Sequence, residues 1–284
     1  MTFKEKLAKN QFVYTAELFP PKGTDLSVLQ SKAELLKSFI DCVNVTDNQR
    51  AVMRISGVAV SKTLIDMGIE PVFQLTARDR NRLALQSDLL GASVLGIKNV
   101  LLLAGDFPTL GDHKEAMPVY DVDTIQLITL ANTLTKGTDI MGRKLKGAPN
   151  FFLGATANPN LDPTELQLIM MEKKIKAGAN FFQTQVCFEP ERLKPFIEMA
   201  KKYQVKILPS ISIFRSFNQM ESFKNFGIRI PDSYLKLMKD TKDPLQTSIE
   251  IIADLIKQLK PVVDGIHIIA INIEENIPKI FDLL

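Results

Sequence analysis

The feature that most restricts the fold of this chain is an alternation of short apolar runs with longer segments of helical periodicity. The runs read FVYTAE, CVNVT, PVFQLT, NVLLLAGD, FFLGAT, NFFQTQ, KILPSI and GIHIIAIN, which makes eight candidate strands. They are nearly continuous in apolar character, as is typical of parallel strands covered on both faces. The segments between them favour helices; in residues 25–40, apolar side chains recur at spacings of three and four.

Start and stop signals for helices fit the same pattern. The sequences DPTE at 162–165 and DPLQ at 243–246 each combine a capping acid, a proline for the first turn and a side chain that can reach back. We therefore expect Asp162 and Asp243 to cap two helices, and Gly178 to end the helix before the sixth strand.

Eight strands, each followed by a helix, predict an α/β fold of the (β/α)8 TIM barrel type. The alternative is an open doubly wound sheet, but no strand–GxGxxG–helix unit supports it. No internal repeat or linker divides the chain, so we expect residues 1–284 to form a single barrel domain. Two long irregular stretches, residues 105–120 and 137–150, have a length more typical of functional loops.

Composition argues against several classes of function. A net charge of +3 with scattered Lys and Arg does not indicate nucleic-acid binding, and no apolar run is long enough to span a membrane. The first residues, MTFKEKLAKNQF, lack the apolar core of a signal peptide, so we expect a cytoplasmic protein. The two cysteines, Cys42 and Cys187, are too few for a disulfide framework or a cysteine-rich metal site.

Polar side chains stand at the carboxyl ends of the predicted strands, where barrel enzymes place their active sites. This ring contains no lysine, which argues against a Schiff-base enzyme. Histidine is absent too, because His113 is in a loop and His267 is inside the last strand, so we expect no metal site. In chain order the ring consists of Glu17, Thr46, Asp47, Asn48, Thr76, Asp106, Thr156, Asn158, Gln183, Gln185, Ser210, Ser212 and Asn272.

Glu17 and Asp106 are separate carboxylates among the amides and hydroxyls of this ring. Such a set can hold a flat, polyamide-like ring and supply one general acid, which suggests heterocycle chemistry with electron transfer left to a bound cofactor. Glu17 also fits a solvated strand end, but we expect the Phe-Pro-Pro segment at 19–21 to form an apolar wall beside it. Asp106 fits a turn after a glycine as well as it fits a functional role.

Five further residues have both an ordinary and a functional interpretation. Gln183 and Gln185 share one face of their strand, and amides that face a barrel interior need partners, of which a ligand is one. His267 is better explained as a hydrogen-bonded core histidine than as a ligand. Lys173 and Lys174 are typical of a solvated helix face, with a phosphate contact as the alternative.

Six motifs follow one another along the chain: AELFPPKG, VNVTDN, QLTARD, LLAGDFP, KKIKAGANFFQTQ and GIRIP. In this order, and over nearly the whole chain, they resemble the motifs of the methylenetetrahydrofolate reductase family. The resemblance implies a flavin-containing (β/α)8 barrel that reduces 5,10-methylenetetrahydrofolate to 5-methyltetrahydrofolate. VNVTDNQRAVMR and RDRNRLALQSDLLGA are similar to the short bacterial form, which serves one-carbon metabolism in methionine biosynthesis and in acetogens.

The resemblance also implies roles for individual residues. In the family, the residue matching Glu17 is the general acid that protonates a folate nitrogen, after which reduced flavin delivers hydride to the one-carbon unit. The residue matching Asp106 contacts the pterin and tunes the flavin, and those matching Gln185 and Gln219 lie on the substrate side. The implied cofactor-binding set, with its neighbours in the ring, is Thr46, Asp47, Asn48, Gln74, Thr76, Ala104, Gly105, Asp106, Tyr120, Thr156, Asn158 and Lys174.

The chain departs from the family pattern at three places. Gln74 stands where relatives often carry histidine, and Ala104 where they carry arginine; both positions face the flavin. Ile271-Asn272-Ile273 replaces Leu-Asn-Arg, so the arginine that contacts folate is missing. These departures leave FMN as an alternative to FAD and weaken the case for NADH as direct reductant. Relatives of this type imply a small iron–sulfur or zinc-binding partner subunit as electron source, or a homo-oligomer.

Two other interpretations stay open. One is a pterin-binding barrel that transfers a methyl group from folate to a corrinoid and holds no flavin. The other is a non-catalytic scaffold barrel in a reductase complex. Interior carboxylates cost free energy to bury, which argues against a scaffold.

Overall fold

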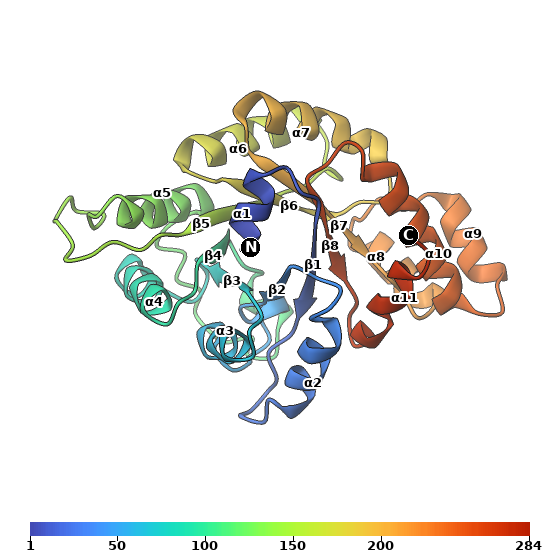
Figure 1. The fold of residues 1–284 in the computed structure, drawn as a ribbon, viewed down its shortest axis with the longest axis horizontal. Coiled ribbons are helices and arrows are strands. Elements are labelled where there is room, and N and C mark those ends of the chain that lie inside the picture. Colours follow the sequence, from blue (N-terminus) through green and yellow to red (C-terminus); the bar gives the residue numbers. More distant parts are fainter.

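Eight parallel strands close into a barrel in the order β1 to β8 in the computed structural model, which describes residues 1–284 (Figure 1). Each strand pairs with its neighbours along the chain, and β1 pairs with β8 to complete the ring. The strands are β1 Val13–Leu18, β2 Cys42–Val45, β3 Pro71–Thr76, β4 Asn99–Leu103, β5 Phe152–Ala157, β6 Phe181–Val186, β7 Lys206–Ser212 and β8 Gly265–Ile269.

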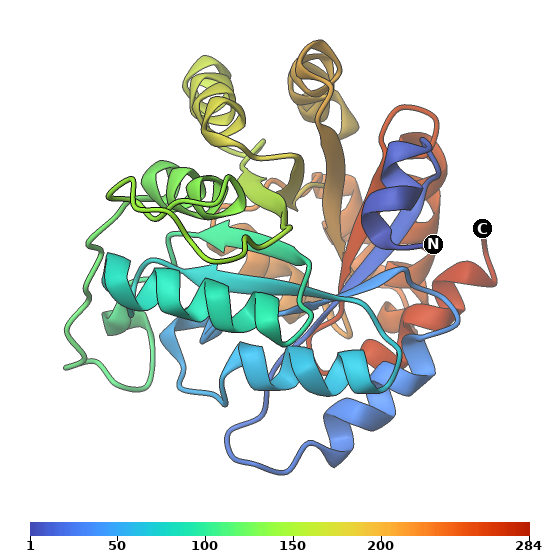
Figure 2. The ribbon, with the colours of Figure 1, turned by 60° about the vertical axis from the view of Figure 1, so that its left-hand side comes forward.

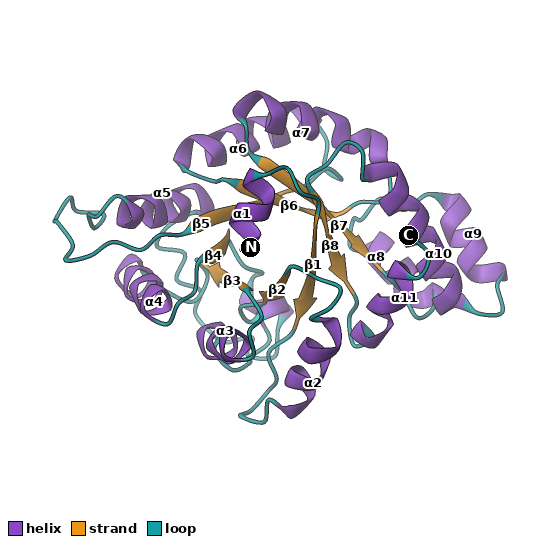
Figure 3. Cartoon of the chain, viewed as in Figure 1, coloured by secondary structure: helices purple, strands orange, loops and turns teal.

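Helices surround this ring of strands (Figure 2, Figure 3). Two of them, α8 and α9, are additional to the alternating pattern and lie between β7 and α10 along the chain. No helix is both long and apolar enough to cross a membrane. The helices are α1 Phe3–Ala8, α2 Ser27–Leu36, α3 Gly57–Asp66, α4 Arg82–Val94, α5 Thr124–Thr135, α6 Thr164–Ala177, α7 Pro190–Tyr203, α8 Phe217–Asn225, α9 Asp232–Asp240, α10 Pro244–Leu259 and α11 Ile277–Phe281.

The predicted (β/α)8 TIM barrel is confirmed, and each of the eight predicted runs overlaps one strand. The open doubly wound sheet is wrong, because the pairing of β1 with β8 leaves no free edge. Residues 25–40 form the shorter helix α2. Residues 105–120 contain only the 3₁₀ turn Pro108–Leu110, and residues 137–150 contain one isolated bridge, so both stretches are irregular as expected.

Helix boundaries follow two of the three predicted signals. Asp243 caps α10 by accepting a backbone N–H three residues further on, and Gly178 follows the last residue of α6. Asp162 does not cap α6, because no side chain bonds to the start of that helix. Its carboxylate instead pairs with the guanidinium groups of Arg192 and Arg229, which compete successfully for the same oxygens.

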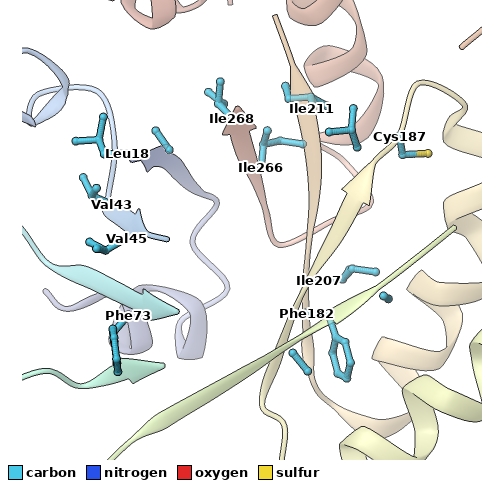
Figure 4. Packing of buried hydrophobic residues seen from close by; sticks show 14 of the residues in the cluster. Leu18, Val43, Val45, Phe73, Phe182, Cys187, Ile207, Ile211, Ile266 and Ile268 are labelled. Atoms are coloured by element: carbon cyan, nitrogen blue, oxygen red, sulfur yellow. The ribbon is translucent and has the colours of Figure 1, made fainter. Parts of the chain in front are cut away.

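The main core lies between the strands and the surrounding helices. Alternate residues of each strand point outward into it, as Val43 and Val45 of β2 do, while the residues between them face the barrel interior. Figure 4 shows part of this packing, which buries apolar side chains from several strands. Labelled there are Leu18, Val43, Val45, Phe73, Phe182, Cys187, Ile207, Ile211, Ile266 and Ile268.

A second, smaller apolar cluster fills the amino-terminal end of the barrel interior. Phe3 and Leu7 of α1 belong to it, so this helix closes that end, and Figure 1 shows it across the middle of the strands. Phe3 makes edge-to-face contacts with Phe152 and Phe181, with ring centroids 5.9 and 5.5 Å apart. Gly154 is required beside them, because a Cβ there would lie 2.2 Å from the Phe181 ring.

Candidate active site

A cavity of about 350 Å³ opens at the carboxyl ends of the strands. Only four of its 18 lining residues are hydrophobic, so the two ends of the barrel differ sharply in character. From the predicted site it contains Glu17, Asp47, Gln74, Thr76, Ala104, Gly105, Asp106, Thr156 and Gln185. Its other lining residues are Gln49, Arg78, Leu101, Leu103, Gln183, Thr184, Ser210, His267 and Ile269.

Glu17 is a buried carboxyl group of this cavity, with 6% of the residue exposed. The Nε2 atom of Gln74 donates a hydrogen bond to its Oε2 at 3.0 Å, and Nε2 of Gln49 approaches its Oε1 at 3.4 Å. Nε2 of His267 lies 3.8 Å from Oε2. Nitrogen atoms from β3, β8 and the loop after β2 therefore converge on Glu17 and can stabilise the carboxylate that remains after proton donation.

The expected apolar wall beside Glu17 is wrong. None of residues 19–21 lines the cavity, and the groups around the carboxyl are amides and an imidazole. The carbonyl of Pro20 accepts a hydrogen bond from Nη1 of Arg54 at 2.9 Å, and the carbonyl of Pro21 accepts one from the N–H of Ile55 at 3.0 Å. The segment is thus bound to the loop before α3, which holds it outside the cavity.

His267 is the main residue that sequence reasoning left out of the site. It is buried and hydrogen-bonded through Nδ1 to Oγ1 of Thr15 at 2.9 Å, as expected of a core histidine, but it also lines the cavity beside Glu17. The alternation of side chains along β8 could have indicated this position. His267 lies two residues before Ile269, which also lines the cavity, and is therefore on the same face of the strand. His267 was left out because it lies inside the last strand, although Gln183, in the same row on β6, was included in the predicted ring.

Gln183 lies in the same row as His267, on β6. Its amide forms a reciprocal pair with the amide of Asn44: Nδ2 of Asn44 donates to Oε1 at 2.6 Å, and Nε2 of Gln183 donates to Oδ1 at 3.2 Å. Nε2 of Gln183 also lies 3.2 Å from Oγ1 of Thr15. The protein itself therefore supplies the partners that an interior amide needs, whereas Gln185 is exposed towards the cavity.

Asp106 is exposed at the rim of the cavity and also contacts the loop after β2. Its Oδ2 accepts a hydrogen bond from the backbone N–H of Arg50 at 2.9 Å. Gly105, before it, has φ of +89°, and a Cβ there would lie 3.0 Å from Cβ of Arg78 and 3.1 Å from Cβ of Thr76. Asp106 is therefore a cavity-rim residue that also fixes the loop after β2, and the turn expected after Gly105 is not seen.

Arg78 is a second lining residue that was not predicted. Its side chain is 2% exposed, and its Nε and Nη2 atoms each lie 2.7 Å from an oxygen of Asp79. It also donates to the carbonyls of Asn48 and Asp106, at 3.2 and 3.1 Å. One guanidinium thus ties together the loops that follow β2, β3 and β4, a connection that no local pattern in the sequence indicates.

Asp47 and Asn48 have mainly structural contacts. Oδ2 of Asp47 accepts hydrogen bonds from the N–H and Oγ1 of Thr76, at 2.9 and 2.8 Å, and the carboxylate also binds Arg80 through both oxygens. Asn48 does not line the cavity, and its Oδ1 accepts a hydrogen bond from the N–H of Arg54 at 2.9 Å. These residues shape the loops after β2 and β3.

A smaller pocket of about 190 Å³ adjoins the cavity and shares Thr156 and Gln185 with it. Asn158 and Lys174, both members of the predicted cofactor-binding set, line this side pocket. Nζ of Lys174 donates to the carbonyl of Thr156 at 2.6 Å and has no carboxylate partner. Removal of the ammonium from water lowers the pKa of Lys174 to about 8.

Besides Asn48, three predicted residues do not line either space. The hydroxyl of Thr46 is buried at the end of β2 without a hydrogen-bond partner. Tyr120 donates its hydroxyl proton to the carbonyl of Gly105 at 2.9 Å, and Gln219 accepts the N–H of Arg215 through Oε1 at 2.9 Å. The structure therefore brings most of the predicted site together but leaves Thr46, Asn48, Tyr120 and Gln219 outside the lining.

Known proteins match this chain along almost its full length. The sequence profile of the family described as methylenetetrahydrofolate reductase covers residues 2–284. This chain belongs to that family. The resemblance seen in the motifs is thus confirmed.

Relatives within the methylenetetrahydrofolate reductase family are distant in sequence. Methylenetetrahydrofolate reductase 2 of Schizosaccharomyces pombe is 23% identical over 97% of this chain and 46% of its own length, so this chain spans about half of that relative. The 5,10-methylenetetrahydrofolate reductase of Escherichia coli is 25% identical over 93% of this chain and 88% of its own. The enzyme of Pectobacterium carotovorum is 27% identical over 76% and 69%.

Solved structures show the same barrel at lower identity. An uncharacterized protein from Clostridium thermocellum, described as binding two copies of 5-methyl-5,6,7,8-tetrahydrofolic acid, has a TM-score of 0.68 over 99% of this chain and 98% of its own, at 17% identity. Tryptophan synthase from M. tuberculosis has a TM-score of 0.53 over 99% and 91%, at 12% identity. These likenesses establish the fold alone.

Proposed function

We propose that this chain catalyses the flavin-dependent reduction of 5,10-methylenetetrahydrofolate to 5-methyltetrahydrofolate, with Glu17 as general acid. Membership of the family supports the reaction class. The observation that carries the proposal is the position of Glu17, a buried carboxyl group that lines the cavity and is bound by Gln74. The description of the Clostridium thermocellum neighbour as a folate-binding protein adds support for the ligand.

Glu17 acts on the substrate as a proton donor. In its protonated form the carboxyl gives its proton to the folate nitrogen that bridges the one-carbon unit, which opens the five-membered ring to an iminium ion. The N–H groups of Gln74 and Gln49 then hold the carboxylate that is left, at contacts of 3.0 and 3.4 Å. A positioned acid of this kind typically contributes about 10²–10⁴-fold to a rate.

The residues around the cavity fit a flavin. The amide of Gln185 and the side chain of Thr156 offer hydrogen bonds to the edge of a flat heterocycle. Thr46 is assigned to the flavin from the family alone, because its buried hydroxyl lies outside the lining. The ammonium of Lys174, which has no carboxylate partner, suits a phosphate group. A bound flavin would supply the hydride; FAD is proposed from the family, with FMN as the alternative.

Folate would enter from the rim of the same cavity. Asp106 is exposed there and Gln185 faces it, so we assign both to the substrate side. Gln219 is assigned the same role from the family, although its amide oxygen is bound to Arg215 in this structure. Reducing equivalents would come from a small iron–sulfur or zinc-binding partner subunit, with or without a homo-oligomer of this chain. The reaction would belong to a cytoplasmic one-carbon pathway that serves methionine synthesis or acetogenesis.

The flavin half-reaction tests this proposal directly. The protein is made anaerobic, reconstituted with FAD or FMN and chemically reduced, after which 5,10-methylenetetrahydrofolate is added and the visible flavin spectrum is followed. Reoxidation with formation of 5-methyltetrahydrofolate is expected. Flavin that binds but stays reduced contradicts the substrate assignment. Absence of flavin binding, together with methyl transfer to a corrinoid, would replace the proposal with the methyltransferase interpretation.

A further inference from the structure

Behind Glu17, five buried polar side chains form one connected row through the barrel interior. The row runs from Glu17 to His267, then through Thr15 to the paired amides of Gln183 and Asn44. Each residue is at most 6% exposed. Asn44 and Gln183 belong to β2 and β6, which lie four strands apart in the closed ring, so the amide pair crosses the barrel.

Thr15 has only one hydroxyl proton to give. Its two acceptors are Nδ1 of His267 at 2.9 Å and the carbonyl of Ile266 at 3.5 Å, so the imidazole offers the better bond. Nε2 of Gln183 lies 3.2 Å away and donates into the same oxygen. A hydroxyl that accepts a hydrogen bond becomes a stronger donor, so the amide of Gln183 favours donation by Thr15 to the ring.

The orientation of the amides decides which way this chain of bonds runs. With the shorter Asn44–Gln183 contact donated by Asn44, the NH₂ group of Gln183 faces Thr15. If both amides were turned over, the oxygen of Gln183 would face Thr15 and take its proton instead. Nδ1 of His267 would then have to carry a proton and donate to the hydroxyl, which is the opposite tautomer.

We propose that Gln183 and Asn44 are positioning residues that hold neutral His267 in its Nε2–H tautomer through Thr15. In that tautomer the ring directs an N–H at Oε2 of Glu17, 3.8 Å away. A small approach of the two side chains makes this a hydrogen bond that favours the carboxylate formed when Glu17 gives up its proton. The catalytic consequence rests on the proposed role of Glu17, whereas the tautomer assignment does not.

Nitrogen NMR of the imidazole tests the tautomer without folate or flavin. The chain has only two histidines, so His113→Asn in protein labelled with ¹⁵N-histidine leaves the signals of His267 alone. Long-range ¹H–¹⁵N correlation, recorded as pH is raised until the ring signals stop changing, distinguishes the protonated nitrogen from the bare one. Protonation at Nε2 is expected, and a ring protonated at Nδ1 in the otherwise unaltered protein overturns the proposal.

Substitutions then test the origin of the tautomer. Gln183→Leu and Thr15→Val are each expected to give a mixture of tautomers, whereas Thr15→Ser keeps the hydroxyl and should keep the Nε2–H form. Gln185→Leu, on the same strand but without contact to Thr15, is the matched control and should leave the ring signals unchanged. A pure Nε2–H ring in Gln183→Leu would show that the amides do not set the tautomer.

The kinetic readout separates this inference from the proposed function. In the flavin half-reaction, Gln183→Leu is expected to lower the rate constant about tenfold, corresponding to one hydrogen bond, with little change in the folate concentration at half-saturation. A changed tautomer with an unchanged rate would remove the catalytic consequence. Absence of folate reduction in the unaltered protein would remove the proposed function and leave the tautomer result standing.

Discussion

The two ends of the barrel interior are built from the same strands but hold opposite kinds of side chains. At the amino-terminal end, Phe152, Phe181 and Leu208 pack with Phe3 and Leu7 of α1 in an apolar plug. Two residues further along β1, β2, β3, β6 and β7, the interior becomes polar, and the cavity follows. Because side chains alternate along a strand, every second residue faces inward at both ends. The inward-facing side chains nevertheless change from apolar to polar within one repeat of two residues.

This contrast separates stability from chemistry. The plug buries aromatic rings against one another and encloses no polar group that needs a ligand. The cavity end buries Glu17, His267 and Gln183, each of which costs free energy unless its polar atoms are bonded. Barrel enzymes commonly divide their two faces in this way. Substitutions at the two ends should therefore change different measured quantities.

The largest effect is expected from exchanging a carboxyl for an amide at the cavity end. Glu17→Gln cannot give up a proton, so folate reduction should fall by about 10²–10⁴-fold while flavin content stays normal. The same exchange at Glu70, whose Oε2 accepts the N–H of Phe3 at 2.8 Å beside the plug, is the matched control. Glu70→Gln should affect stability and leave the rate of the folded protein unchanged. Retained turnover in Glu17→Gln would remove Glu17 from the role of acid.

The plug should respond in the opposite sense. Phe181→Ala leaves a void next to Phe3 and Phe152 and should lower the free energy of unfolding by about 3–5 kcal/mol, measured by urea denaturation. Phe226→Ala, at an exposed position outside the core, is the control and should have little effect on unfolding. If Phe181→Ala were instead to abolish folate reduction in fully folded protein, the separation between the ends would be wrong.

The fold, and the site residues at the carboxyl ends of the strands, could be predicted from the sequence for a physical reason. The β-branched runs and the capping acid Asp243 are local signals, and the carboxyl ends of eight parallel strands must meet at one rim. Glu17, Thr76 and Thr156 were therefore predicted into one cavity from their positions alone, whereas Gln74 was predicted only through the family resemblance. Local signals failed at Asp162, where two distant arginines outcompete the helix start.

Contacts between loops and between rows of the interior could not be predicted in the same way. Arg78 is fixed by carbonyls 28 and 30 residues away in the chain, and His267 meets Thr15 across the strand pairing that closes the barrel. The segment at 19–21 has the composition of an apolar wall, yet its place is decided by Arg54 and Ile55. Such partners are known only once the chain is folded.

A smaller effect is expected at Lys174, whose buried ammonium group lowers the stability of the folded protein. The pKa of Lys174 is lowered from 10.5 to about 8 by burial, so the unfolded chain binds more protons between these values and stability rises with pH across that window. Lys174→Met removes an unfavourable charge worth about 3 kcal/mol and loses a hydrogen bond of about 1 kcal/mol to Thr156.

Urea denaturation of the flavin-free protein at several pH values measures this. Lys174→Met should be more stable than the unaltered protein at pH 7, by about 2 kcal/mol, and the difference should shrink towards pH 10. Lys173→Met, at an exposed position on the same helix, should show no such dependence on pH. A difference that stays constant with pH would contradict an unfavourably buried ammonium. Weaker flavin binding by Lys174→Met would add support for a phosphate contact.

The smallest effect is expected at the rim, where cavity and solvent meet. Asp106 and Asp112 each accept a backbone N–H from the loop after β2, at 2.9 Å from Arg50 and 3.0 Å from Met53, but only Asp106 lines the cavity. Asp106→Asn keeps an acceptor and removes the charge, so folate affinity should fall by up to about tenfold, with a shift in flavin potential.

Asp112→Asn is the matched control, because it weakens the same loop without altering the lining. Titration of folate and spectroscopic measurement of the potential decide the question: equal effects in both variants would assign Asp106 to the loop, whereas an effect confined to Asp106→Asn would extend the functional end of the barrel to its exposed rim.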